Sequence, residues 1–196
     1  MKQPANKRSE RIEEVFHQSN FAFWTICLIH DNPLLPVFRN PYKLLATAGL
    51  KSGQKVLEVG CGPGFFTIPA SKIVGSEGLV YAVDTHPLAI KRVKKKIEKE
   101  GIRNVKPILA NASDTGLPEQ SVDLAFLFGV PRIVGGLENV LSELRRVLRT
   151  GAVLSFEKAR GSQERLIEEV ERKGFSLLEK QGRIFLLTKS RDDENA

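Results

Sequence analysis

Residues 56 to 64 read Val-Leu-Glu-Val-Gly-Cys-Gly-Pro-Gly, an apolar run that ends in three closely spaced glycines. The apolar run predicts a buried parallel strand, and the glycines predict a tight turn whose backbone can approach a ligand closely. Asp84 follows about twenty residues later, at the expected end of the next strand. A carboxylate in that place suits the two hydroxyls of a ribose. The stretch therefore predicts a site for an adenosine-containing cofactor.

Outward from this stretch, strand-like and helix-like segments alternate along the chain. Strand patterns occupy residues 55–59, 79–83, 105–109, 122–128 and 152–156, and helical patterns occupy residues 65–74, 86–100, 137–148 and 166–170. A weaker helical pattern lies over residues 8–17. Asn40-Pro41 predicts the capped start of a helix over residues 42–48 that Gly49 ends. Strands that alternate with helices predict a parallel sheet covered on both faces. The last two strands, 175–179 and 183–188, are joined by a turn so short that they must be antiparallel. We predict an α/β fold, a doubly wound and mostly parallel seven-stranded sheet with an antiparallel C-terminal hairpin.

Length and composition limit the class of protein. A chain of 196 residues is expected to form one domain. Its two cysteines, Cys27 and Cys61, are too few for a disulfide framework or a Cys-rich zinc site. No spacing of His, Cys, Asp and Glu is typical of a metal site, and no apolar run reaches the roughly 18 residues that span a bilayer. We expect a cytoplasmic protein without a metal.

The net charge of +7 raises the question of a polyanionic partner. Much of the excess lies in residues 91–99, where lysines and an arginine surround apolar positions at helical spacing. This spacing favours the solvated face of an amphipathic helix over an RNA-binding patch. Nucleic acid is therefore a possible but less favoured partner.

The glycine loop has alternative interpretations. A dinucleotide-binding loop needs a glycine where this chain has Phe65, because that glycine lets the following helix pack closely. A phosphate-binding P-loop needs Lys-Ser or Lys-Thr after the glycines, and neither follows. Cys61 could be a nucleophile, although a small residue in such a loop is usually filler. Asp84 could be no more than the cap of the next helix.

Taken together, these segments resemble the class I S-adenosylmethionine-dependent methyltransferases. Residues 56–64 are similar to the first motif of that family, and Val-Tyr-Ala-Val-Asp-Thr-His-Pro, residues 80–87, resembles the second. Residues 110–123 are similar to the segment that closes around adenine, and residues 148–151 to the turn before strand five. The likeness extends over about residues 40–190 and points to the branch of the ubiquinone/menaquinone-biosynthesis methyltransferases.

The resemblance implies S-adenosyl-L-methionine as the cofactor and S-adenosyl-L-homocysteine as the product. It also implies an organisation in which residues 1–40 form a helical or lid segment of the same domain, residues 41–190 form the methyltransferase domain, and residues 191–196 form a disordered tail. The family usually builds a lid over the acceptor from residues that precede the core. Here that position belongs to the apolar stretch 21–29, which could equally seal the sheet or form a homodimer contact.

Roles carry over from the family residue by residue. The predicted cofactor-binding residues are Glu58, Gly60, Cys61, Gly62, Gly64, Asp84, Thr85, His86, Asn111, Ala112 and Phe128. By the resemblance, Glu58 and the glycine backbone would lie near the methionine end, Asp84 would bind both ribose hydroxyls, and the two residues after it would line the adenine. Asn111 would meet the adenine amine, and Phe128 would offer its carbonyl to the ammonium. The family often has an acid in place of Asn111, but an amide oxygen can also accept from an amine.

The acceptor is less well defined. After strand four the chain reads Phe128-Gly-Val-Pro-Arg132. It lacks the Asn/Asp-Pro-Pro-Tyr of methyltransferases that act on planar amino groups, and the histidines of the branch it resembles. A small-molecule acceptor is favoured, and Arg132 could pair with an acidic one. The candidates for a general base are His30, Asp31 and Tyr42, of which none is preferred. A methyltransferase of RNA or protein, a non-catalytic adenosyl-ligand binder and a nicotinamide-dependent protein remain open alternatives.

Overall fold

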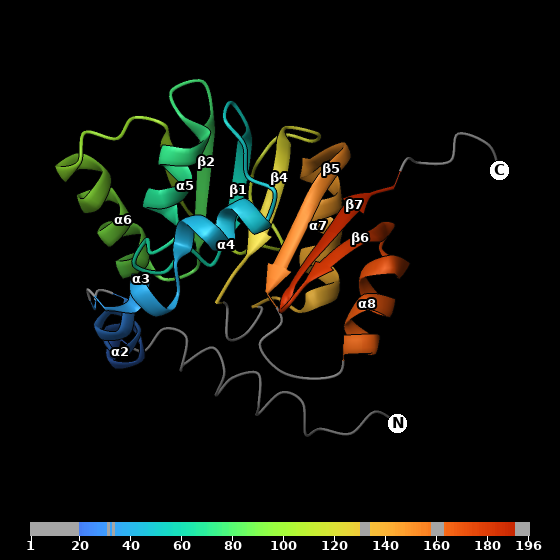
Figure 1. Cartoon of the computed structure of the whole chain (residues 1–196), viewed down its shortest axis with the longest axis horizontal. Coiled ribbons are helices and arrows are strands. Elements are labelled where there is room, and N and C mark those ends of the chain that lie inside the picture. The colour runs from blue at the N-terminus through green and yellow to red at the C-terminus, as the bar shows by residue number, and fades with distance from the viewer. Residues whose placement is uncertain (1–19, 31, 33, 130–133, 158–162, 191–196) are drawn as a thin grey trace.

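A computed structural model describes residues 20–30, 32, 34–129, 134–157 and 163–190 of the chain. Within these ranges seven strands form one sheet in the order β3-β2-β1-β4-β5-β7-β6 (Figure 1). The strands are β1 (Lys55–Val59), β2 (Leu79–Asp84), β3 (Val105–Leu109), β4 (Val122–Leu127), β5 (Leu148–Glu157), β6 (Phe175–Gln181) and β7 (Ile184–Lys189). The first five run parallel, whereas β7 lies antiparallel between β5 and β6. The predicted fold class is confirmed.

Helices cover both faces of the sheet (Figure 1). The described helices are α2 (Asn20–His30), α3 (Leu35–Phe38), α4 (Pro41–Thr47), α5 (Thr67–Val74), α6 (Pro87–Lys99), α7 (Leu137–Val147) and α8 (Gln163–Arg172). α4, α5 and α6 pack on one face, and α7 and α8 pack on the other. Successive strand residues point to opposite faces. Val56 therefore belongs to the buried cluster under α4, α5 and α6, and Leu57 belongs to the buried cluster under α7 and α8.

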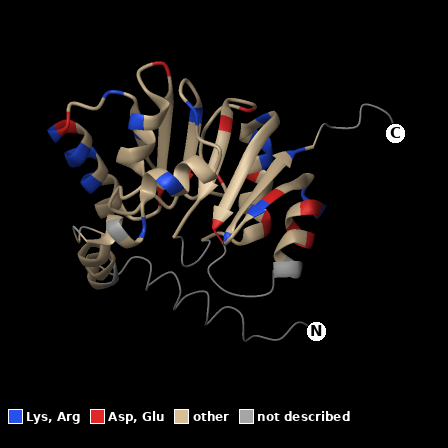
Figure 2. Cartoon of the chain, in the orientation of Figure 1, with Lys and Arg blue, Asp and Glu red and all other residues tan. Residues whose placement is uncertain are grey.

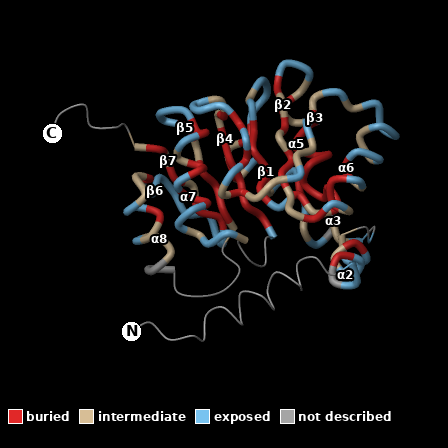
Figure 3. The backbone as a smooth tube through the Cα atoms, turned by 180° about the vertical axis from the view of Figure 1, so that it is seen from behind, coloured by how far each residue is buried: buried red, intermediate tan, exposed pale blue. Residues whose placement is uncertain are grey.

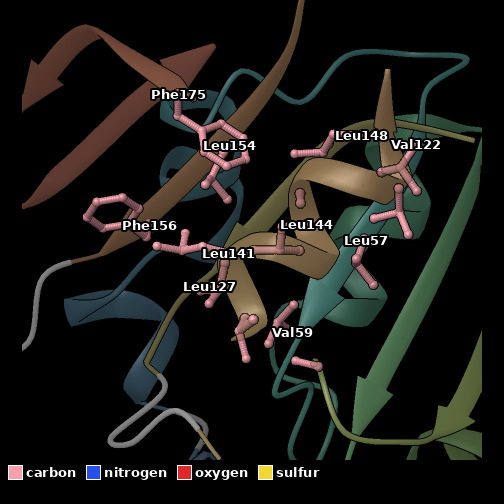
Figure 4. Packing of buried hydrophobic residues seen from close by; sticks show 14 of the residues in the cluster. Leu57, Val59, Val122, Leu127, Leu141, Leu144, Leu148, Leu154, Phe156 and Phe175 are labelled. Atoms are coloured by element: carbon pink, nitrogen blue, oxygen red, sulfur yellow. The ribbon is translucent and has the colours of Figure 1, made fainter. Parts of the chain in front are cut away.

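The strands form the buried centre of the molecule, as the red segments of Figure 3 show. Figure 4 shows the cluster under α7, where Leu141 and Leu144 of the helix lie among side chains of β1, β4 and β5. Leu144 and Leu154 in this cluster are fully buried. Because both faces of the parallel strands are covered, their sequences are almost continuously apolar.

Local signals before β1 act as the sequence predicts. The side chain of Asn40 accepts a hydrogen bond from the Lys43 amide at 3.1 Å and caps α4, and Pro41 occupies the first helical position. Gly49 follows the helix with φ +88°, a conformation that favours glycine. These signals place the chain at the start of β1.

The predicted boundary between α7 and β5 is wrong by several residues. The helix ends at Val147, and the strand begins at Leu148 instead of residue 152. Leu148 pairs with Val122 at the start of β4, which places it in the sheet. Gly151 has φ +75°, and the register shifts between Val122 and Leu124, so the strand absorbs the glycine as an irregularity.

The start of α5 and the apolar stretch before the core also differ from, or add to, the sequence predictions. α5 begins at Thr67, not at residue 65, because Gly64 (φ +87°) holds the chain in a turn that its amide closes on the Cys61 carbonyl at 3.0 Å. The apolar stretch 21–29 is part of the helix α2. The helix predicted over residues 8–17 and the predicted tail, residues 191–196, lie outside the described residues.

Candidate functional site

The candidate site lies where the parallel strands end, at the carboxyl edge of the sheet. From β1 the chain crosses to β2 and β3 on one side, whereas β4 and β5 lie on the other side of β1. Such a reversal of strand order opens a crevice outside the strand ends, where ligands of α/β proteins bind. The glycine loop follows β1 at this position, and Asp84 ends β2.

The loop after β1 is built from glycines with positive φ. Gly60, Gly62 and Gly64 have φ values of 74°, 51° and 87°, which L side chains rarely adopt. The amides of Gly60 and Cys61 both donate to the Val83 carbonyl, at 2.8 and 3.0 Å. A Cβ atom at Gly62 would meet nothing within 4 Å, whereas one at Gly64 would lie 3.2 Å from the Val93 side chain. Gly64 therefore allows close packing on α6, and Gly62 faces open space.

Asp84 organises this loop. Its Oδ2 atom accepts a hydrogen bond from the Gly62 amide and its Oδ1 atom accepts one from the His86 amide, both at 2.8 Å. A carboxylate has about four lone-pair sites, and each of its oxygens can accept more than one donor. The cap of α6 is His86, whose Nδ1 atom accepts from the Leu88 amide at 3.2 Å. The alternative that Asp84 is the helix cap is therefore wrong.

Glu58 lies behind the glycine loop with only 2% of its surface exposed. Its Oε2 atom accepts a hydrogen bond from the Thr67 hydroxyl at 2.6 Å. Burial raises its pKa from 4.5 to about 8, the charge of Asp84 acts in the same direction, and the Thr67 hydrogen bond opposes both. The carboxyl group is thus mostly protonated at neutral pH and would ionise beside a bound cation.

Cys61 has the environment of filler, not of a nucleophile. Burial raises the pKa of its thiol well above the ordinary value, and the charges of Glu58 and Asp84 raise it further. A nucleophilic cysteine needs the opposite surroundings, since the thiolate is the reactive form. The chemistry of the site therefore has to come from elsewhere.

The remaining predicted residues gather at the same edge. The Ala110 amide donates to the Asp84 carbonyl at 3.1 Å, which brings the end of β3 to the end of β2. The side-chain oxygen of Asn111 accepts from the Ser113 amide at 3.0 Å, so this residue shapes its own loop. Phe128 directly follows β4, and its ring lies against that of Phe66 with a centroid distance of 5.6 Å. Thr85 is half-buried and Ala112 is buried.

Helix α2 packs beside the glycine loop and α6. The ring of Phe23 stacks on that of His86 with a centroid distance of 4.7 Å and an interplanar angle of 17°. The ring of His30 lies 5.3 Å from that of Phe65 at the end of the loop. Phe23 is buried, whereas Trp24 remains 56% exposed. A cover over the site is one of the interpretations that the sequence leaves open for the apolar stretch 21–29, but the sequence carries no signal that pairs Phe23 with His86.

A second group of side chains lies at the ends of β4 and β5 and was missed from the sequence. Arg39, which follows α3, forms an ion pair with Glu157, the last residue of β5. The same Glu157 oxygen accepts from the Gly129 amide at 3.2 Å, and the Arg39 guanidinium lies 5.4 Å from the centroid of the Phe66 ring. One signal was present, because Glu157 ends a strand with a carboxylate as Asp84 does. Arg132 and Asp31, two sequence candidates, lie outside the described residues.

Comparison with known proteins places this geometry in a family. A family model described as "Methyltransferase domain" matches residues 50–190. The crystal structure of a SAM-dependent methyltransferase from Aquifex aeolicus is similar, with a TM-score of 0.68 and 28% identity over 80% of this chain and 92% of that one. The chain belongs to the class I S-adenosylmethionine-dependent methyltransferases. The family's cofactor is S-adenosyl-L-methionine.

Curated relatives indicate the branch of the family to which the chain belongs. The ubiquinone/menaquinone biosynthesis C-methyltransferase UbiE of Marinomonas sp. (strain MWYL1) is 31% identical over 184 residues, which are 92% of this chain and 72% of that protein. The aklanonic acid methyltransferase DauC of Streptomyces sp. (strain C5) is 34% identical over 44% of this chain and 41% of its own length. The resemblance to the UbiE-like branch is confirmed. The chain spans between 41% and 62% of the lengths of the first curated relatives it matches.

The residues of the candidate site fit the family's cofactor. The open space at Gly62 admits a ligand against the backbone, Asp84 places a carboxylate beside that glycine for a diol, and Glu58 offers a buried carboxyl group for the cationic end of the cofactor. Among the described residues, no group of three or more His, Cys, Asp or Glu side chains could hold a metal ion. In the same part of the chain, no helix has the length and apolar character that a membrane crossing requires.

Proposed function

We propose that this chain transfers the methyl group of S-adenosylmethionine to a small-molecule acceptor. One observation carries the proposal: Asp84 at the end of β2 holds the amide of Gly62, a glycine that faces open space at the reversal point of the sheet. In a chain of the methyltransferase family, this arrangement supports cofactor binding at that loop. The relatives named after ubiquinone, menaquinone and aklanonic acid support a small-molecule acceptor.

Each predicted residue has a role in this proposal. Asp84 accepts from both ribose hydroxyls through its two carboxylate oxygens, each of which can accept more than one donor. Glu58 and the glycine backbone hold the charged end of the methionine part, together with the carbonyl of Phe128. Thr85 and His86 line the adenine. The backbone amide of Ala112 meets the adenine ring, and Asn111 meets its amine with the second lone pair of the oxygen already engaged by Ser113.

The loop residues Gly60, Cys61 and Gly64 serve this site through their backbone. The amides of Gly60 and Cys61 tie the loop to the Val83 carbonyl, and Gly64 lets the loop lie against Val93 of α6. Because these contacts fix the turn before any ligand arrives, little ordering is left to occur on binding.

The protein's task in this reaction is alignment. Bound S-adenosylmethionine supplies an activated methyl group on a positively charged sulfur. The chain has to hold the acceptor in line with that group and exclude water. The rings of Phe66, Phe126 and Phe128 lie in mutual contact at the ends of the strands, and α2 covers the loop side with Phe23. A general base is needed only for an acceptor that binds in its protonated form.

Methyl-labelled cofactor tests the proposal. The purified protein is incubated with labelled S-adenosylmethionine and a fractionated cell extract, and label is expected in material of low molecular mass. A thermal shift should appear with S-adenosylmethionine and S-adenosylhomocysteine and not with NAD, since a ligand stabilises only the fold that binds it. Stabilisation by NAD alone would support the nicotinamide alternative. Cofactor binding without transfer to any fraction would support a non-catalytic binder.

A second candidate function follows from the basic charge. Lysines and arginines line the outer side of α6 (Figure 2), and Lys91, Lys94, Lys95 and Lys99 are exposed. An RNA or protein acceptor predicts label that ribonuclease or protease removes, and polymer binding that weakens with salt. We favour the solvated face, because Ile90 and Val93 of the same helix are buried against the sheet as in an ordinary amphipathic helix.

We also propose that the protein works in the cytoplasm, alone or as a homodimer. Both cysteines are buried and neither takes part in a disulfide, which fits a reducing compartment. The exposed apolar side chains of α2, Phe21, Trp24, Leu28 and Ile29, offer a surface that a second copy could cover. Light scattering at several concentrations distinguishes monomer from dimer.

A further inference from the structure

We infer that Arg39, held in place by Glu157, binds the methyl acceptor and selects acceptors that carry an anionic oxygen. The inference rests on the proposed methyl transfer and names its substrate class. It concerns a pair of residues remote from the cofactor loop in the sequence, since Arg39 precedes the core fold and Glu157 ends β5.

The pair lies on the β4 and β5 side of the crevice, whereas Asp84 lies on the β2 side. Glu157 ends β5, and the Gly129 amide that donates to its Oε2 atom follows the end of β4. The Arg39 guanidinium lies over the ring of Phe66, which follows the glycine loop. The cation is therefore placed between the cofactor loop and the ends of β4 and β5. In doubly wound sheets a ligand occupies the crevice outside these strand ends.

The guanidinium retains donors for a ligand. It carries five N–H groups, and in the described part of the chain its ion pair with Glu157 involves Nη2. The side chain of Arg39 is 32% exposed, whereas that of Glu157 is 11% exposed. Glu157 is thus the packed partner that orients the group, and Arg39 is the more exposed partner that a ligand can reach. The Phe66 ring beneath the guanidinium restricts its movement.

An anionic oxygen satisfies this donor set better than a neutral one. Charge-assisted hydrogen bonds to a guanidinium are about twice as strong as neutral ones, and a planar fork matches an enolate, phenolate or carboxylate. The carboxylate of Glu157 opposes the anion. However, an oxygen bound at about 3 Å from a guanidinium nitrogen lies roughly twice as far from that carboxylate, so attraction outweighs repulsion.

The charge balance of the transfer agrees with this choice. An electron pair of the acceptor forms the new bond to the methyl carbon, while the carbon–sulfur bond breaks and its pair stays on sulfur. The negative charge of the acceptor and the positive charge of the sulfonium disappear together. An acceptor that Arg39 holds in its ionised form therefore needs no further base at the moment of transfer.

The test separates acceptors by charge. The small-molecule pool of a cell extract is divided under nitrogen by anion exchange at about pH 10.5, where phenols and carboxylic acids are anionic. Both the bound and unbound pools are incubated with labelled S-adenosylmethionine and the full-length protein. We expect at least tenfold more label in the bound pool. In R39Q the amount of bound pool that gives half-maximal rate should rise at least tenfold, with R39K intermediate.

A matched control is available at the opposite edge of the sheet. Arg149 forms an ion pair with Asp123 where β5 and β4 begin, so R149Q removes the same kind of ion pair at the other end of β5. R149Q should leave unchanged the amount of bound pool that gives half-maximal rate. Calorimetry should give S-adenosylhomocysteine dissociation constants within twofold of wild type for R39Q, R39K and E157Q. E157Q should resemble R39K, because the fork remains but loses its orientation.

The outcomes separate the inference from the function beneath it. Label only in the unbound pool, or equally in both, overturns the inference and leaves methyl transfer standing. An unchanged half-saturation in R39Q also overturns the inference. A change in maximal rate alone, with an altered pH profile in E157Q, overturns it too and assigns Glu157 to proton transfer. Label in neither pool, with the cofactor bound, overturns the proposed small-molecule transfer and the inference with it.

Discussion

At the scale of single residues, Asp84 combines two tasks in one carboxylate. It already accepts the amides of Gly62 and His86, so it shapes the loop before any cofactor is present. The Asp84→Ala variant should therefore bind S-adenosylmethionine at least tenfold more weakly, since the hydrogen bonds to the ribose and the preformed loop are lost together. Isothermal titration calorimetry measures the dissociation constant.

Asp123→Ala is the matched control for this prediction. Its carboxylate also accepts a hydrogen bond from a backbone amide, that of Lys55 at 2.7 Å. This contact lies at the start of β1, far from the carboxyl ends of the strands where the site lies. We expect the control to keep wild-type affinity. An unchanged dissociation constant in Asp84→Ala would remove this residue from the site.

Glu58 makes a prediction about pH. Because its pKa is raised from 4.5 to about 8, the folded protein keeps a proton that the unfolded chain releases. The stability of the cofactor-free protein should therefore fall as the pH rises from about 4.5 to about 8, and this contribution should be level above pH 8. Glu58→Gln keeps the neutral form and should exceed wild type in stability at pH 9 by roughly 2 to 5 kcal/mol. Urea unfolding at pH 5, 7 and 9 measures the difference.

Glu143 provides a comparison of opposite sign. Burial alone would raise its pKa, but hydrogen bonds from Arg146 and Thr115 lower it below the ordinary value. Its stabilising contribution is therefore present at neutral pH and is lost as the pH falls through the lowered value. Glu143→Gln should be less stable than wild type at pH 7. If both glutamine variants shifted stability in the same direction at pH 7 and 9, the explanation for Glu58 would be wrong.

At the scale of elements, α2 and α6 meet at the start of α6. Phe23 of α2 stacks on His86, whose amide donates to Asp84, so the helix supports the ribose end of the proposed site. Phe23→Ala should weaken cofactor binding about three- to tenfold, because the lost stacking loosens the residue next to the carboxylate. Calorimetry checks the affinity, and hydrogen exchange of residues 84–88 checks the loosening.

The neighbouring aromatic residue serves as the control for α2. Trp24 is 56% exposed and contacts Arg92 on the outer side of α6. Trp24→Ala removes a similar aromatic side chain from the same helix and should leave the affinity unchanged. Equal losses in both variants would mean that the helix as a whole, and not the contact of Phe23 with His86, supports the site.

At the scale of the whole molecule, α7 stabilises the sheet that carries the site. Leu144 is fully buried between α7 and the strands (Figure 4). Leu144→Ala should lower the free energy of unfolding by about 2 to 5 kcal/mol, the usual cost of a lost leucine and the cavity it leaves. Leu178→Ala, at a position that is 59% exposed on β6, should change it by less than about 0.5 kcal/mol. Denaturant unfolding compares the two, and a similar small loss in both would contradict the packing described here.

Much of the fold could be predicted because its signals are local. The apolar run before Gly60, the cap at Asn40 and the short turn before β7 act through the conformations of neighbouring residues, and all of these predictions are confirmed. The boundary at Leu148 failed because its pairing with Val122 decides the outcome. Leu148 continues the apolar spacing of the helix, but its pairing with a residue of β4 makes it part of the sheet.

The glycine loop, the position of Asp84 and the alternation of strands with helices are consequences of the order of residues along the chain, because sterics and short-range periodicity act between neighbours. The contact of Arg39 with Glu157, 118 positions away, and that of Phe23 with His86 exist only once helices and strands have packed. No local pattern encodes such pairs, since the meeting of distant side chains depends on the angle and depth at which whole elements come together. The cofactor could thus be inferred from a short motif, whereas the residues proposed to choose the acceptor emerged only from tertiary packing.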